Sequence, residues 1–195
     1  MLGVSCGGAS SCVAVGEAAG KPVAEAWNGS AWSLSSAPPL PAAAKGATLA
    51  AVSCGSTRVR NCMAVGDSYE GTGTEKALAE RWDGSAWSIV AVPAPSGAKG
   101  FVDLTDVACL SPNACFSAGY YAPELVGGAP VSLKTLAESW EGTEWTVLTT
   151  PNLASQTFNA LAGISCTTSI DCTAVGGATS SPTKRPPVQL AMRYE

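Results

Sequence analysis

The stretch LAERWDGSAWSIVAVP, Leu78–Pro93, decides the fold of this chain. Apolar and polar residues alternate on both sides of its centre, which is the pattern of β-strands with one buried face. Asp83 and Gly84 lie between the two halves, and an Asp-Gly pair is a strong signal for a tight turn because these residues accept positive φ. Pro93 closes the second half. The stretch therefore predicts an antiparallel hairpin.

The same hairpin recurs twice elsewhere in the chain. WNGSAW occupies positions 27–32 and WEGTEW positions 140–145, and the spacing of the two tryptophans does not change. Self-similarity of this kind is the sequence signature of repeat architectures, so the hairpin marks one part of a repeated unit. The predicted turn residues are Asn28, Gly29, Asp83, Gly84, Glu141 and Gly142.

Each hairpin is preceded by two more apolar segments, of the form LxxVSC and CxAVG. The first cysteine of each such pair falls at 6, 54, 109 and 166, which gives four units at about 1–48, 49–103, 104–160 and 161–195. Both segments are predicted as strands, so each unit has four short strands. Most of the length variation follows AVG, and that segment is expected to be a loop facing solvent.

Four-stranded antiparallel units repeated in tandem point to an all-β chain, built as a β-propeller-like array of blades. A β-solenoid would need shorter and stricter rungs. In the fourth unit the chain reads QLAMRYE, so Tyr194 replaces the first tryptophan and the last blade is expected to be incomplete. We expect 1–195 to be a single propeller-type domain or a fragment of a larger propeller.

The eight cysteines fall into four pairs that each flank a polar turn between two predicted strands. Facing Cα atoms in such a hairpin are about 4.5–5.5 Å apart, a spacing that a disulfide tolerates. Zinc sites favour closer pairs that converge, often with histidine, and a CxxC redox motif is absent. We therefore predict disulfides and an extracellular location, although the chain shows no signal peptide. The pairs are Cys6 with Cys12, Cys54 with Cys62, Cys109 with Cys115, and Cys166 with Cys172.

Composition argues against several classes of function. Lys and Arg total 11, are scattered along the chain, and accompany a net charge of -4. Nucleic-acid binding needs clustered cations, so no nucleic-acid partner is expected. No apolar run reaches the length of about 18 residues that a membrane-spanning helix needs, so no membrane insertion is expected. Histidine is absent, which removes the commonest general base and metal ligand.

Carboxylates and arginines remain as catalytic candidates. Glu25, Glu80 and Glu138 each precede a tryptophan by two residues, and we interpret them as solvated or edge-pairing side chains because catalysis needs one asymmetric site. A sialidase-like site would need an arginine cluster, and the arginines share no repeated position. We expect no enzymatic activity, catalytic residue, cofactor or metal site, and leave a surface calcium ion open. The five arginines are Arg58, Arg60, Arg81, Arg185 and Arg193.

The tryptophans are the candidate ligand-binding residues. Aromatic faces stack on sugar C–H groups, but rings beside a hairpin also fill the space between neighbouring blades. The first tryptophan of each hairpin is interpreted as structural, because its strand alternates with polar neighbours. The second is often only partly buried, so it is interpreted as packing, with a glycan-binding role kept as the alternative. These second tryptophans are Trp32, Trp87 and Trp145.

The pattern LxxVSC…CxAVG…AExWxGxxW…P resembles that of secreted bacterial, especially actinobacterial, β-propeller repeat proteins, over nearly the whole chain. The WDGSAW hairpin is more distantly similar to the Asp-box turns of sialidase-like propellers, which are structural. The resemblance implies a propeller fold and export, and it implies no catalysis.

Three functions follow as alternatives. The expected one is non-enzymatic extracellular recognition or scaffolding, with a glycan or an extracellular protein as the partner. The second is a structural or assembly module that self-associates or completes its sheet with another chain through the incomplete last blade, because unpaired strand edges invite pairing. The third is a fragment of a sialidase-like glycoside hydrolase.

Overall fold

The computed structural model of the chain describes residues 1–36, 38–55, 60–71, 73–181 and 188–194. These residues form strands and no helix, which confirms the predicted all-β class. They accordingly contain no helix with the length and hydrophobicity that a membrane crossing requires. The strands are β1 (Gly3–Gly8), β2 (Ser11–Ala18), β3 (Lys21–Trp27), β4 (Trp32–Leu34), β5 (Gly46–Cys54), β6 (Cys62–Gly71), β7 (Thr74–Trp82), β8 (Trp87–Val90), β9 (Val102–Ser111), β10 (Ala114–Val126), β11 (Ala129–Trp140), β12 (Trp145–Val147), β13 (Phe158–Thr168), β14 (Asp171–Thr179) and β15 (Val188–Tyr194).

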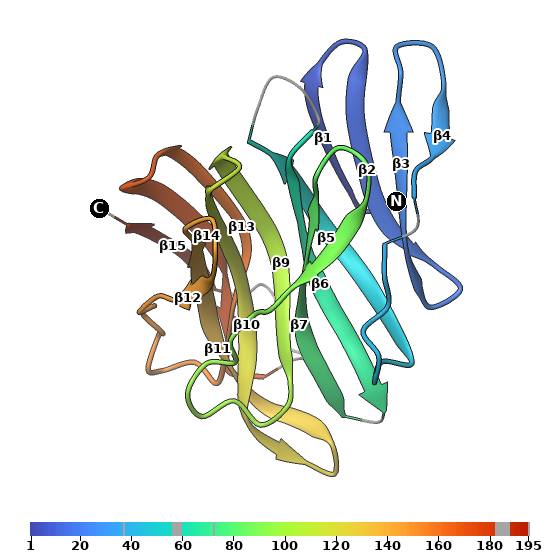
Figure 1. Cartoon of the computed structure of the whole chain (residues 1–195). Coiled ribbons are helices and arrows are strands. Elements are labelled where there is room, and N and C mark those ends of the chain that lie inside the picture. Colours follow the sequence, from blue (N-terminus) through green and yellow to red (C-terminus); the bar gives the residue numbers. More distant parts are fainter. Residues whose placement is uncertain (37, 56–59, 72, 182–187, 195) are drawn as a thin grey trace.

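The strands form one antiparallel meander for each sequence unit (Figure 1). We call them sheet 1 (β1–β4), sheet 2 (β5–β8), sheet 3 (β9–β12) and sheet 4 (β13–β15). Sheets 1, 2 and 3 have four strands each, as the repeat predicts, and sheet 4 has three in the described part of the chain. A single parallel bridge between Leu133 and Phe158 joins sheets 3 and 4.

Disulfides close the first hairpin of every sheet, as predicted. Each joins facing residues of the first two strands, with Cα atoms 4.0 Å apart. The chain has no other cysteine to pair, and none of the eight is free. A bond that closes so short a loop restricts the unfolded chain by about 2 kcal/mol in the loop-entropy model, and here it fixes the register of the hairpin as well.

The sheets follow one another face to face in chain order, from the N-terminal end of the molecule to the C-terminal end (Figure 1). The first strands lie next to each other, since β1 contacts β5, β5 contacts β9, and β9 contacts β13. We call the side of a sheet toward the preceding sheet its leading face, and the other side its trailing face. Each pair of neighbouring sheets thus encloses one hydrophobic layer.

The three hydrophobic layers are built from equivalent positions of the repeat. Between sheets 1 and 2, Val13 and Val15 on one trailing face meet Val52 and Leu78 on the next leading face. Equivalent residues fill the layer between sheets 2 and 3, and the layer between sheets 3 and 4. Successive side chains along a strand of an internal sheet therefore point into two different hydrophobic layers, because both faces of that sheet are covered.

Candidate functional site: the tryptophan rows and the faces of the end sheets

Each disulfide belongs to a row of residues that crosses a whole sheet. In sheet 1 the backbone register aligns Cys6 with Cys12, Cys12 with Trp27, and Trp27 with Trp32. The centroids of the two indole rings are 5.7 Å apart in sheet 1, and 5.4 and 5.8 Å apart in sheets 2 and 3, which is a favourable separation for aromatic pairs. In sheet 4 the row ends at Tyr194, which faces Cys172.

The turn between the two tryptophans is stabilised by the side chain that precedes the glycine. Asp83 Oδ1 accepts hydrogen bonds from the backbone N–H groups of Ser85 and Ala86, at 2.8 and 2.9 Å, and Asn28 makes the same two bonds in sheet 1. The N–H of Ala86 and the hydroxyl of Ser85 lower the pKa of Asp83 below its ordinary value. Of the two central residues of each turn, only the glycine has a positive φ: 99° at Gly29, 100° at Gly84 and 90° at Gly142.

The first tryptophan of a row connects its hairpin to the disulfide-bounded turn. Trp27 Nε1 donates a hydrogen bond to the carbonyl oxygen of Ala9 at 3.1 Å, and Trp140 Nε1 donates to that of Pro112 at 3.3 Å. Both acceptors lie in the turn between the first two strands of the same sheet. These bonds give the first tryptophan a structural role in the sheet itself.

The second tryptophan of a row differs sharply among the sheets. Trp87 and Trp145 are buried, with 7% and 4% of their surface exposed, because each packs in the layer shared with the preceding sheet. Trp87 Nε1 also donates a hydrogen bond to Oγ of Ser35, the residue after β4, at 3.4 Å. Trp32 is 44% exposed, because no other sheet among the described residues packs on the leading face of sheet 1. Of the three predicted ligand-binding tryptophans, Trp32 alone presents its ring to solvent.

The repeated glutamates are the main correction to the sequence interpretation. Glu80 and Glu138 are fully buried, so they are not the solvated or edge-pairing carboxylates expected from their strand. Both point into the layer toward the preceding sheet, on the same face as Leu78 and Trp140. Burial raises the pKa of each to about 8. Glu25, the equivalent residue of sheet 1, is only half-buried because its face is uncovered.

The buried glutamates are poorly hydrogen-bonded. Ser117 Oγ lies 3.5 Å from Glu138 Oε2, while Glu138 Oε1 and both carboxylate oxygens of Glu80 have no hydrogen-bond partner among the described residues. A buried carboxylate without partners favours its neutral form, which is the physical cause of the raised pKa. In sheet 4 the corresponding residue is Met192, which is apolar and buried.

A second group of acids lies between sheets 2 and 3. Burial first, and then the charges of Asp103 and Glu75, raise the pKa of Asp67 to about 7. Asp103 accepts a hydrogen bond from the Tyr120 hydroxyl at 2.7 Å, and burial followed by this carboxylate raises the pKa of Tyr120. Within the described ranges no three metal-ligating side chains come close enough together to hold an ion.

The arginines do not assemble a site among the described residues. Arg81 lines a narrow crevice between sheets 2 and 3, and Arg193 pairs with Asp171 at 3.1 Å on the surface of sheet 4. Arg60 lies under the turn at Gly84. Arg58 and Arg185 lie outside the described residues.

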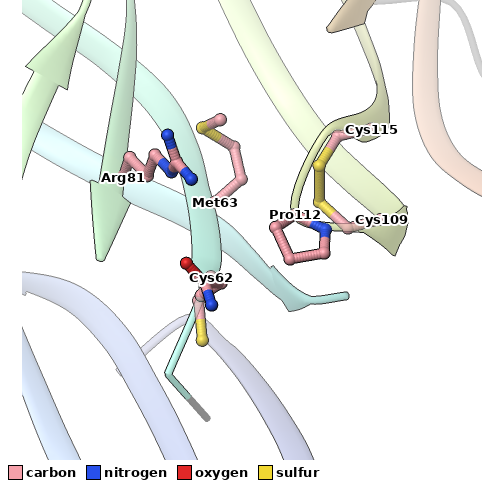
Figure 2. Close-up of a pocket in the computed structure, with 7 residues that line it drawn as sticks. Cys62, Met63, Arg81, Cys109, Pro112 and Cys115 are labelled. Atoms are coloured by element: carbon pink, nitrogen blue, oxygen red, sulfur yellow. A yellow bond between two sulfur atoms is a disulfide. The ribbon is translucent and has the colours of Figure 1, made fainter. Parts of the chain in front are cut away.

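Figure 2 shows this crevice, and with it the way one sheet meets the next. The Cys109–Cys115 disulfide and Pro112 of sheet 3 face Met63 and Arg81 on the trailing face of sheet 2. The sulfur of Cys62 points away from the crevice, to the other side of sheet 2. In sheets 2, 3 and 4 the disulfide therefore belongs to the leading face and packs against the sheet before it.

Hydrogen bonds between first strands are the feature that the sequence interpretation missed. The Cys54 N–H donates to Ser5 Oγ at 3.1 Å, and the Cys109 N–H donates to Ser53 Oγ at 2.9 Å. In both cases the serine before one cysteine accepts from the cysteine of the next sheet. The repeated Ser-Cys dipeptide was visible in the sequence, but its partner is one whole unit away.

Comparison with known proteins adds no family assignment. No protein-family model matches the chain, and a search of curated proteins found no significant match.

Proposed function

We propose that the chain is a non-enzymatic extracellular recognition or scaffold protein whose sheets are the blades of a β-propeller-type array. The partner is a protein or a glycan, and it binds on the leading face of sheet 1. The four disulfides are consistent with an extracellular location. The contacts between successive first strands support an arrangement in which these strands are the innermost ones.

One observation carries the proposal: among the described residues, the leading face is covered in sheets 2, 3 and 4 and exposed in sheet 1. It presents Val4, Trp32 and Leu34 to solvent, beside the half-buried Trp27 and Glu25. A cluster of exposed apolar and aromatic side chains next to a carboxylate has the composition of a recognition surface. The equivalent leading-face residues of the other sheets are buried between neighbouring sheets and hold the array together.

Trp32 is the residue through which the proposal is tested. Trp32→Ala should weaken binding to a panel of immobilised extracellular glycans and proteins about tenfold or more, because aromatic anchors dominate binding surfaces. Ile170→Ala is the control, since Ile170 is 71% exposed but lies in the turn between β13 and β14, away from sheet 1. Equal binding by both variants and the parent chain, with both variants folded, would remove the face from consideration. Hydrolysis of any glycan in the panel would contradict the non-enzymatic part.

A further inference from the structure

Each pair of consecutive sheets is connected by a segment that crosses from the last strand of one sheet to the first strand of the next. We call the segments between β4 and β5, between β8 and β9, and between β12 and β13 the linkers. All three contain the same backbone turn, in which an N–H donates to the carbonyl oxygen three residues earlier. The pairs are Ala44 with Pro41, Ala98 with Pro95, and Gln156 with Leu153. The turn aligns the three linkers, so their residues can be compared position by position.

The residue before this turn decides how the end of each hydrophobic layer is filled. Leu40 packs against the layer between sheets 1 and 2. Ala94 is its equivalent in the second linker, and it lines a hollow of about 210 Å³ between sheets 2 and 3. Asn152, in the third linker, is bonded to sheet 3, where its Oδ1 accepts the N–H of Thr135 at 3.0 Å. The short side chain of Ala94 therefore leaves space in the second junction that a leucine side chain fills in the first.

The walls of this hollow, which we call the Ala94 hollow, are mostly aliphatic. They come from β7, from the second linker and from the first residue of β9. The aliphatic residues beside Ala94 are Ala77, Val92, Pro93, Ala98 and Val102. Ligand pockets usually measure about 300–1,000 Å³, so a hollow of about 210 Å³ fits a body of only a few carbon atoms.

Glu75 contributes a carboxylate to this apolar lining. Its position in the repeat is fixed by a parallel bridge to Phe101, which matches the bridge of Leu133 to Phe158. Gly20 is the equivalent residue of sheet 1, so neither neighbouring unit carries a charge at this position. The carboxylate therefore departs from the repeat at the same junction where the leucine is missing. An apolar hollow with few polar groups has the composition of a small-ligand site.

The negative charge at the Ala94 hollow is not compensated. Lys76 also lines the hollow, but it pairs with Glu70, and Glu75 has no ion-pair partner among the described residues. Burial and then the charge of Asp103 raise the pKa of Glu75, and the charges of Asp103 and Glu75 act in the same way on Asp67. The three carboxylates thus repel one another, and a cation beside Glu75 would relieve that repulsion.

We propose that the Ala94 hollow binds a small aliphatic amine in its protonated form, with the alkyl group between Ala94 and Val102 and the ammonium group at the Glu75 carboxylate. The alkyl group takes the place that the Leu40 side chain has one junction earlier, and the ammonium group supplies the missing cation. Burial of the alkyl group favours binding, and the ion pair selects a cation over neutral or anionic molecules of the same shape. The site lies between sheets 2 and 3, so it is separate from the leading face of sheet 1.

Isopentylamine is the probe for this site, because it carries the leucine side chain on an aminomethyl group. Isothermal titration calorimetry at neutral pH should give a dissociation constant of about 1 mM, a value within reach of so small a ligand. Isopentanol and isovalerate have the same carbon skeleton, the first without charge and the second with a negative charge. Both should bind at least about tenfold more weakly, because neither forms the ion pair with Glu75.

Two variants test the two halves of the site. Ala94→Leu places in the second linker the side chain that Leu40 has in the first, so it should weaken isopentylamine binding at least about tenfold without lowering the melting temperature. Ala98→Leu is a second filling variant if Ala94→Leu does not fold. Glu75→Gln removes only the charge, so isopentylamine should bind no better than isopentanol, whose own affinity stays unchanged. Glu144→Gln, at an exposed position, is the matched control and should bind isopentylamine as the parent chain does.

Equal dissociation constants for isopentylamine and isopentanol, or amine binding that Ala94→Leu leaves unchanged, would overturn the inference. NMR amide shifts locate the ligand, and the changes should centre on Ala77 and Val102. Changes centred on Leu133 and Asn152, which line the equivalent hollow between sheets 3 and 4, would also overturn it. Trp32→Ala should leave isopentylamine binding unchanged, so a failure at the Ala94 hollow leaves the proposed function standing.

Discussion

At the scale of the residue, the buried glutamates are the most unusual feature of the chain. Two carboxyls stand at equivalent positions of two apolar layers, almost without hydrogen-bond partners. Neighbouring charges do not cause the raised pKa of Glu80, which comes from burial alone. A group of this kind makes the folded state prefer the protonated form, so the stability of the protein must depend on pH.

The direction of that dependence follows from the pKa values. The folded-state pKa of Glu80 and Glu138 is about 8, above the ordinary 4.5, so between these values the folded chain holds protons that the unfolded chain has lost. Stability is therefore greatest below the ordinary pKa and falls as the pH rises through about 8. Asp67 shifts in the same direction. We expect the melting temperature to be several degrees lower at pH 8.5 than at pH 5, because one pKa unit corresponds to about 1.4 kcal/mol.

Glu80→Gln assigns this effect to a side chain. Glutamine has a similar shape and does not ionise, so the variant should lose part of the pH dependence and melt above the parent chain at pH 8.5. Glu144→Gln, at an exposed position, is the matched control and should follow the parent curve. Identical pH profiles for Glu80→Gln and Glu144→Gln, measured by circular dichroism, would show that the Glu80 carboxyl is not kept neutral by folding.

At the scale of the element, the turn between the tryptophans depends on glycine for two separate reasons. Gly29 has a φ of 99°, and a Cβ at this position would lie 2.8 Å from Ser10 Cβ in the disulfide-bounded turn. The hairpin of β3 and β4 thus packs against the hairpin of β1 and β2 within one sheet. Gly97 has a similar φ of 88°, but a Cβ there would meet no atom within 4 Å.

Alanine substitutions at these two glycines distinguish the cost of backbone strain from the cost of a steric contact. Gly97→Ala should lower the free energy of unfolding by about 1 kcal/mol, through backbone strain alone. Gly29→Ala should cost at least about 1 kcal/mol more, because the hairpin must also move away from Ser10. Chemical denaturation of both variants measures the difference. Equal losses would mean that the two hairpins of sheet 1 are not packed tightly against each other.

The elements could be predicted from the sequence far better than their surroundings. Alternation, the Asp-Gly turn at Asp83 and the cysteine spacing are local signals, and the strands and disulfides that they predict are present. The solvation of Glu80 and the burial of Trp32 both depend on a neighbouring sheet. Strand alternation does not say which face a neighbouring sheet will cover. The same local pattern therefore yields a buried tryptophan in sheet 2 and an exposed one in sheet 1.

At the scale of the whole molecule, stability should be distributed junction by junction, because each sheet contacts mainly its neighbours. The junction between sheets 3 and 4 differs from the others. Ala108 stands where Ser5 and Ser53 provide a hydroxyl, so the bond to the next cysteine is missing. Asp106 replaces it, with Oδ2 accepting the N–H of Ile164 at 2.8 Å.

Asp106→Ala should therefore loosen sheet 4 without unfolding the rest of the chain. Removal of this acceptor leaves the Ile164 N–H buried and unpaired at the junction, at a cost of about 1–3 kcal/mol. Hydrogen exchange followed by mass spectrometry should show faster exchange in β13, β14 and β15, while sheets 1 and 2 keep their protection. Ser53→Ala removes the corresponding acceptor one junction earlier, so its faster exchange should centre on β5 and β9. If both variants accelerate exchange evenly over all the sheets, the molecule unfolds as one cooperative unit and the junctions are not separable.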